Sequence, residues 1–115
     1  MKLKKRTIKK LEKAGFSYRW DEDDKIHGFA KSSPRGQDFW FELKDEEDLA
    51  DLARAAKEYY EAYDPSYEAY LWLDETGHGK NGAPYDMKEL YEDMEACEQY
   101  IDDVFEILYE EAYGK

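Results

Sequence analysis

A chain of 115 residues with a formal net charge of -12 at pH 7 is long enough for one domain with a modest hydrophobic core. Charged residues make up 40% of the chain, which leans toward disorder, but the 17% aromatic content supplies enough apolar surface for a folded domain. The single cysteine, Cys97, excludes an internal disulfide and a multi-cysteine zinc site. Because no apolar stretch has the length of a signal peptide or a membrane span, we expect a cytoplasmic protein.

The charge is divided unevenly along the chain. Residues 1–13 carry a net charge of +6, whereas the remaining residues carry -18. A basic segment on an acidic body either folds back on that body or serves as an interaction arm, and folding back needs no partner. As an arm, the segment would contact DNA phosphates through the side chains of Lys4, Lys5, Arg6, Lys9 and Lys10.

The first half of the chain predicts one short helix followed by three strands. Residues 3–14 favour a basic helix that ends at Gly15. Alternating apolar and polar residues then predict strands at 16–20, 26–31 and 37–43. The connections between them are short, which is typical of an antiparallel meander. Gly28, inside the second strand, is expected to mark a bulge.

The middle of the chain predicts two helices in succession. Asp45 is a candidate N-cap for a helix that runs to about Tyr63, with further carboxylates in its first turn. Asp64 and Pro65 together are typical of a new helix start. Residues 67–74 also fit a strand pattern, but this start signal favours a helix.

The final helix has the strongest pattern in the chain. Glycines and a proline between residues 77 and 84 predict a loop, after which Asp86 and Glu89 form a capping box. Apolar residues then recur at alternating spacings of four and three, at Leu90, Met94, Cys97, Ile101, Val104 and Leu108. Such a stripe is buried, so the Cys97 thiol is expected to be an inert core residue.

Together these elements predict an α+β fold. We expect a small three-stranded antiparallel meander covered by a helical layer, with a basic N-terminal helix and a long acidic C-terminal amphipathic helix. One domain spans residues 1–115, comprising the basic helix at 3–14, the meander at 16–43 and a helical region at 45–113.

No catalytic or metal-binding pattern fits the sequence. Asp21 and Asp23 begin like a calcium-binding loop, but Lys25 occupies the next ligand position. His27 and His78 are too few for a zinc site and are expected to be solvated. Carboxylate pairs are so abundant that they do not single out a general acid or base. We therefore expect no enzyme, no cofactor and no bound metal.

Several motifs within residues 39–112 resemble a group of small acidic proteins from bacterial prophages and mobile elements. They are the Asp-Pro helix start at Asp64, the apolar cluster around Trp72, the Asn-Gly-x-Pro segment at Asn81 and the Glu-Leu-x-x-Asp segment at Glu89. The group has no assigned activity, so no residue role is carried over. The resemblance implies the company of accessory genes that often encode acidic antagonists of restriction enzymes and CRISPR nucleases.

The acidic surface of the final helix is the main functional candidate. Its carboxylates advance along the helix by a few ångströms each, a spacing of the same order as DNA phosphates. We expect a non-enzymatic acidic protein-binding module that mimics nucleic acid and inhibits a bacterial defence nuclease of the restriction or CRISPR kind. The expected contacts to such a basic protein are Glu92, Glu95, Asp102, Asp103, Glu106 and Glu110, with a second patch at Asp45, Glu46 and Asp48.

Three other interpretations stay open. In the first, the chain is a small DNA-binding regulator that acts through its basic N-terminal helix. In the second, it is a structural protein that forms oligomers through the apolar seam at residues 90–108. In the third, the charges only keep an amphipathic helix soluble while tyrosines shield the core.

Overall fold

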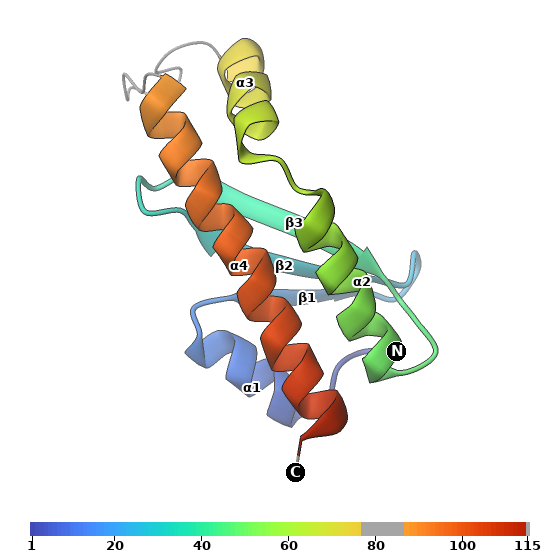
Figure 1. Cartoon of the computed structure of the whole chain (residues 1–115). Coiled ribbons are helices and arrows are strands. Elements are labelled where there is room, and N and C mark those ends of the chain that lie inside the picture. Colours follow the sequence, from blue (N-terminus) through green and yellow to red (C-terminus); the bar gives the residue numbers. More distant parts are fainter. Residues whose placement is uncertain (77–86, 115) are drawn as a thin grey trace.

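The described part of the computed structural model covers residues 1–76 and 87–114. It confirms the α+β class, with a three-stranded antiparallel sheet and helices packed against one face (Figure 1). In chain order the elements are α1 (Lys5–Lys13), β1 (Ser17–Asp21), β2 (Ile26–Ser32), β3 (Asp38–Lys44), α2 (Leu49–Ala62), α3 (Pro65–Thr76) and α4 (Met87–Tyr113).

The sheet is the expected meander, with strand order β1-β2-β3. Tyr18 lies opposite Phe29, and Phe29 opposite Phe41, so three aromatic rings cross the sheet in one row. The ring centroids of Phe29 and Phe41 are 5.1 Å apart, and those of Tyr18 and Phe29 are 5.7 Å apart. Successive side chains alternate between faces, so this row defines the inner face that meets the helices.

The expected bulge at Gly28 is wrong. The register runs without interruption, and Gly28 pairs with Arg19 on one side and Glu42 on the other. A Cβ atom at this position would lie 2.1 Å from the indole ring of Trp40. Glycine is therefore required here because the Trp40 ring lies directly over the backbone.

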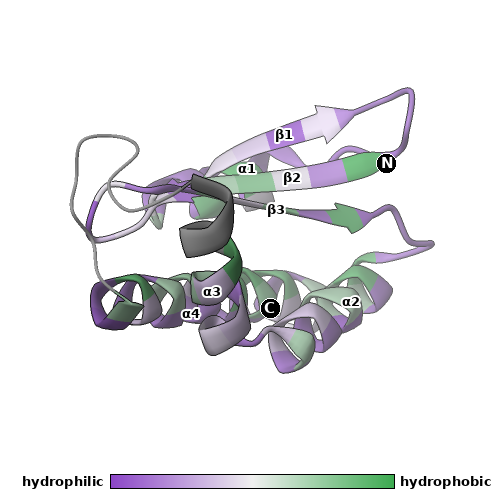
Figure 2. Ribbon diagram, turned by 90° about the horizontal axis from the view of Figure 1, so that it is seen from above, coloured by the Kyte–Doolittle hydropathy of each residue, from purple (hydrophilic) through white to green (hydrophobic). Residues whose placement is uncertain are grey.

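The apolar seam of α4 forms the centre of the core. All six of its predicted residues are buried, and α4 packs against α1, α2 and α3 within the same chain. Figure 2 shows the strands on one side of the molecule and α2, α3 and α4 on the other, with apolar segments between the layers. Because this seam is covered by the chain itself, it is not available to a second copy.

Helix α2 begins three residues later than expected. Its N-cap is Asp48, whose side chain accepts a 2.8 Å hydrogen bond from the backbone N–H of Asp51. Asp45 does not cap the helix, because its own N–H still donates to the Lys25 carbonyl at 2.9 Å, which keeps the chain extended beyond β3. The Asp45 carboxylate instead contacts His27 and the amino group of Met1.

Helix α3 confirms the helical assignment of residues 67–74. Pro65 is its first residue, and the Asp64 carboxylate accepts hydrogen bonds from the N–H groups of Ser66 and Tyr67 at 3.0 and 3.4 Å. The loop expected between residues 77 and 84 and the capping box at Asp86 lie outside the described residues. None of the described helices combines the length and the apolar character needed to cross a membrane.

Candidate functional site

The six carboxylates expected on α4 share one side of the helix. At 3.6 residues per turn they fall within a sector of about 100°, opposite the buried seam. Glu92, Glu95, Glu106 and Glu110 are exposed, and the two aspartates between them are half-buried. The set spans about 27 Å at 1.5 Å per residue. We call this surface the acidic stripe: Glu92, Glu95, Asp102, Asp103, Glu106 and Glu110.

The two ends of the acidic stripe are paired with the molecule's own cations. Arg35 lies 3.3 Å from Glu92, and Lys10 lies 3.9 Å from Glu110. The central carboxylates of the stripe form no ion pair within residues 1–76 and 87–114. The side-chain amide of Gln99 donates to two of them, Asp102 at 3.4 Å and Asp103 at 3.2 Å. The centre of the stripe therefore keeps its negative charge exposed or half-exposed to solvent.

An aromatic ladder runs beside the C-terminal half of the acidic stripe. It consists of Phe105, Tyr109 and Tyr113, with ring centroids 5.6 Å apart for the first pair and 4.7 Å for the second. Tyr109 and Tyr113 are 50% and 58% exposed. These three residues are not among the predicted contacts, although their spacing of four residues places the rings on one side of a helix.

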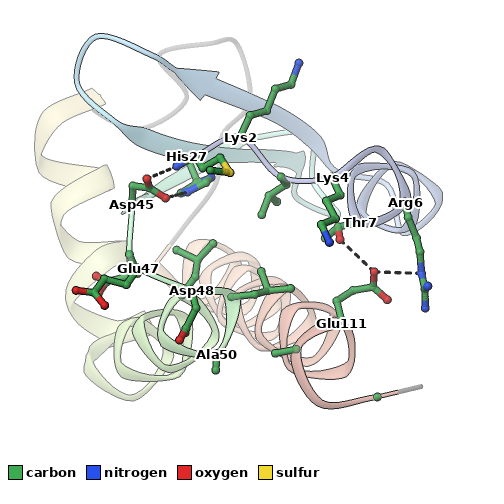
Figure 3. A pocket seen from close by; sticks show the side chains of 17 residues that line it. Lys2, Lys4, Arg6, Thr7, His27, Asp45, Glu47, Asp48, Ala50 and Glu111 are labelled. Atoms are coloured by element: carbon green, nitrogen blue, oxygen red, sulfur yellow. Dashed lines mark hydrogen bonds and ion pairs between the residues drawn. The ribbon is translucent and has the colours of Figure 1, made fainter.

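The second acidic patch does not join the acidic stripe. Asp45, Glu46 and Asp48 line a pocket of about 630 Å³, together with basic residues of the N-terminal segment and Glu111 from α4 (Figure 3). Asp48 is occupied as the cap of α2, and Asp45 binds His27 and the amino group of Met1. Two of the three predicted residues therefore have structural partners inside the molecule.

The expectation of a solvated histidine is wrong for His27, whose side chain is 0% exposed. The hydroxyl of Tyr18 lies 2.8 Å from its Nδ1, and Asp45 Oδ1 lies 2.9 Å from its Nε2. Burial lowers the pKa of His27, although the Asp45 carboxylate opposes the shift. A neutral ring with its proton on Nε2 satisfies both contacts, since it donates to Asp45 and accepts from Tyr18.

This network anchors the N-terminal segment. The backbone N–H of Leu3 donates to the Tyr18 hydroxyl at 3.2 Å, which links the segment to His27 through β1. Figure 3 shows His27 and Asp45 at one side of the pocket, with Lys4 and Arg6 across from them. The His27 side chain lines this pocket but has no solvent-exposed surface of its own.

The basic helix α1 folds back onto α4, as the simpler interpretation of the charge division expected. Glu111 accepts a 2.6 Å bond from Lys10 Nζ and a 3.1 Å bond from Thr7 Oγ1, and Arg6 Nε lies 3.3 Å away. The hydrogen bond from Lys10 is the main reason that the pKa of Glu111 lies below its usual range. The remaining predicted DNA contacts, Lys4, Lys5 and Lys9, are exposed and form no ion pair with a described residue.

One acidic residue of α4 is buried and holds a loop. Asp93 is 1% exposed and accepts hydrogen bonds from Ser33 Oγ and from the backbone N–H of Arg35, the latter at 3.1 Å. Ser33 Oγ in turn accepts from the N–H of Gln37 at 2.9 Å. The Asp93 carboxylate therefore fixes the β2–β3 connection against the N-terminal half of α4.

The Cys97 thiol lies in the core beside this network. Burial, and then the charge of Asp93, raise its pKa to about 12, so it stays protonated and unreactive at neutral pH. Among the described residues, no three His, Cys, Asp or Glu side chains are placed to hold a metal ion.

The fold and its surface define a small α+β protein whose longest helix displays an acidic stripe. No protein-family model, curated protein or solved structure matches this chain. The geometry of the described side chains is therefore the basis for a functional assignment.

Proposed function

We propose that the chain is a non-enzymatic protein-binding module whose acidic stripe docks on a basic nucleic-acid-binding protein in the bacterial cytoplasm. The observation that carries the proposal is the common orientation of the six stripe carboxylates, of which the central ones have no basic partner among the described residues. A surface of this kind repels nucleic acid and attracts a groove lined with lysine and arginine.

A defence nuclease of the restriction or CRISPR kind is the specific candidate partner. Six charges over about 27 Å give a mean spacing of about 5 Å, against about 3.4 Å between phosphates along one strand of B-DNA. The stripe is less dense than DNA but follows the same order of spacing, so a groove built for a phosphate backbone meets several carboxylates at once. The resemblance to small acidic proteins of mobile elements supports the same class of partner.

The aromatic ladder supports protein binding as well. Exposed tyrosines offer a large contact area and a hydrogen-bonding hydroxyl while losing little conformational entropy. Tyr109 and Tyr113 lie beside the stripe, so a partner that pairs with Glu106 and Glu110 also contacts aromatic surface. The carboxylates of the stripe then orient the partner and speed its association, while the tyrosine rings enlarge the contact area.

The test compares two variants of equal net charge for binding to, and inhibition of, purified restriction and CRISPR nucleases. In the stripe variant the central carboxylates become amides, as Glu95→Gln, Asp102→Asn, Asp103→Asn and Glu106→Gln. In the control the same number of exposed carboxylates elsewhere are neutralised, as Glu12→Gln, Asp24→Asn, Glu58→Gln and Glu61→Gln.

We expect the stripe variant to bind at least about tenfold more weakly and the control to bind nearly as well as the original chain. The affinity of the original chain should also fall as salt increases, because exposed charges are screened beyond about 10 Å at 0.1 M ionic strength. Equal losses in both variants, or binding indifferent to salt, would show that the stripe does not make the contact.

A second candidate function, DNA binding through α1, has one observation in its favour. Lys5 and Lys9 lie one turn apart on the exposed side of α1, and Lys4 precedes them. Titration of duplex DNA at low salt tests this function. Replacing these three lysines with glutamine should abolish binding if α1 is the contact, and unchanged binding would exclude it.

A further inference from the structure

The outer face of the sheet has no helix packed over it among the described residues. Helices α2, α3 and α4 lie on the other face in Figure 2, and α1 contacts β1 and α4. By alternation along the strands, the outer face is formed by Ser17, Arg19 and Asp21 of β1, by Ile26, Gly28, Ala30 and Ser32 of β2, and by Asp38, Trp40, Glu42 and Lys44 of β3.

The charges on this outer face follow a regular pattern. One row across the sheet reads Arg19, Gly28, Glu42, and the next reads Asp21, Ile26, Lys44. In each row the two edge strands carry opposite charges and the central strand carries none. The edge strands are separated by two strand spacings, about 9–10 Å, and the two charges of each row form no ion pair with each other in the described part of the chain.

The charged side chains on the two edge strands form no ion pairs with other described residues. Arg19, Glu42 and Lys44 are exposed and form no ion pair within the described part of the chain. Asp21 accepts hydrogen bonds from the N–H groups of Asp23 and Asp24 in the β1–β2 turn, and no cation pairs with it there. Each row therefore carries one positive and one negative side chain, and neither forms an ion pair within the described part of the chain.

An apolar centre lies between the charged edges. The indole of Trp40 leans across from β3 over Gly28, and it remains 44% exposed. Ile26 and Ala30 flank it on the central strand. An apolar centre with an aromatic anchor, bordered by charged residues, is the usual composition of a protein–protein contact.

We propose that this outer face binds a second copy of the chain about a two-fold axis that runs along β2. Rotation about that axis exchanges the two edge strands, which places Arg19 against Glu42 of the second copy and Asp21 against Lys44 of the second copy. Each pair occurs twice by symmetry, as in any isologous contact. The two Trp40 rings, both over the central strand, meet near the axis.

The charge balance of the molecule also favours this face. It carries two basic and three acidic residues, so it is nearly neutral in a chain of net charge -12. The acidic stripe lies in the helical layer, on the other side of the sheet, and its repulsion between copies is screened over distances longer than about 8 Å at physiological salt. Two sheets packed face to face are about 10 Å apart with strands nearly aligned, which suits these side chains.

This contact is independent of the proposed function, since it uses none of the stripe residues. In the resulting dimer the acidic stripes of the two copies point away from the shared sheet contact. A dimer would therefore present two separate acidic surfaces.

Sedimentation of the full chain tests the proposal, with circular dichroism confirming the fold of each variant. The original chain should sediment at twice 13.7 kDa. Arg19→Glu alone and Glu42→Arg alone should each weaken the dimer at least about tenfold, since each sets like charges against each other twice. Lys9→Glu and Glu58→Arg, which make the same charge changes on exposed helical positions, should leave it unchanged.

The decisive sample is an equimolar mixture of the two disruptive variants. Along the proposed axis, Glu at position 19 of one copy meets Arg at position 42 of the other, and the unaltered Arg19 and Glu42 meet as before, so the mixture should form a heterodimer. A monomer for the original chain at about 1 mM, equal effects in the control variants, or no association in the mixture would each overturn the proposal.

Discussion

Glu110 and Glu111 are neighbours in sequence, yet the structure gives them very different surroundings. The Glu111 side chain is 7% exposed and binds Thr7, Lys10 and Arg6, whereas that of Glu110 is 75% exposed and has Lys10 only at 3.9 Å. Changing either residue to glutamine removes one negative charge and preserves the size of the side chain. The two variants therefore isolate the effect of position.

We expect Glu111→Gln to lower the free energy of unfolding by about 1–2 kcal/mol. A hydrogen bond that involves a charged group contributes about 1.5–3 kcal/mol, and the bond from Lys10 is lost because an amide NH₂ group cannot accept it. The amide oxygen still accepts from Thr7, and the partly exposed Lys10 and Arg6 regain water, which reduces the cost. For Glu110→Gln we expect a change within about 0.5 kcal/mol, as for other exposed pairs.

Urea unfolding followed by circular dichroism measures the difference. With a slope of about 1–3 kcal/mol/M, Glu111→Gln should lower the midpoint by about 0.3–2 M at pH 7 without changing the slope. The pKa of Glu111 is lowered in the folded state, so its stabilisation is complete above the unfolded value of about 4.3 and is lost as pH falls through the folded value. The gap between the original chain and Glu111→Gln should therefore narrow in acid.

Equal midpoints for the two variants at pH 7 would refute this reasoning, since they would show that α1 is not held by the Glu111 carboxylate. A gap that stays constant as pH falls below about 4 would also contradict it, because the loss would then not depend on the charge.

Two further substitutions test contacts that position the surfaces described above. Asp93→Ala leaves Ser33 Oγ–H and the Arg35 N–H without their acceptor. We therefore expect the free energy of unfolding in urea to fall by about 3 kcal/mol and tryptic cleavage after Arg35 to become faster. Unchanged cleavage would mean that Asp93 does not hold the loop. Gly28→Ala places a Cβ atom against the Trp40 ring and should displace the indole into water, which a red shift in tryptophan fluorescence would reveal; an unshifted spectrum would contradict the close contact.

Local patterns predicted most of the fold because they report directly on which side of an element is buried. Alternation placed the three strands, and the spacing of Leu90, Met94 and Cys97 placed the seam of α4, since burial on one side leaves a period in the sequence. The Asp64-Pro65 start settled a segment that periodicity left ambiguous. Each of these signals depends only on residues close together in the chain.

The roles of individual charged residues were harder to predict because they depend on distant partners. Asp45 looks like a cap in sequence, but it lies beside His27 only because β2 and β3 pair in this register. The burial of His27 itself follows from the same pairing. No local pattern reports the distance between residues 27 and 45.

Two acidic residues did carry a signal that the sequence analysis did not use. Asp93 lies three residues after Leu90 and four before Cys97, and Glu111 lies three residues after Leu108, so both share the side of the helix that the apolar seam occupies. A carboxylate in that position is buried and needs partners. The helical period therefore indicated which acidic residues form contacts inside the molecule.

The acidic residues of α4 therefore differ in whether they are free to bind a partner protein. Asp93 and Glu111 face inward and hold the molecule's own loop and basic helix, Glu92 and Glu110 are paired at the two ends of the acidic stripe, and the central carboxylates lack a basic partner among the described residues. The net charge of -12 therefore overstates the charge available for binding. A basic groove that docks on α4 would meet the central carboxylates first, and it would gain the end residues only by competing with Arg35 and Lys10 for them.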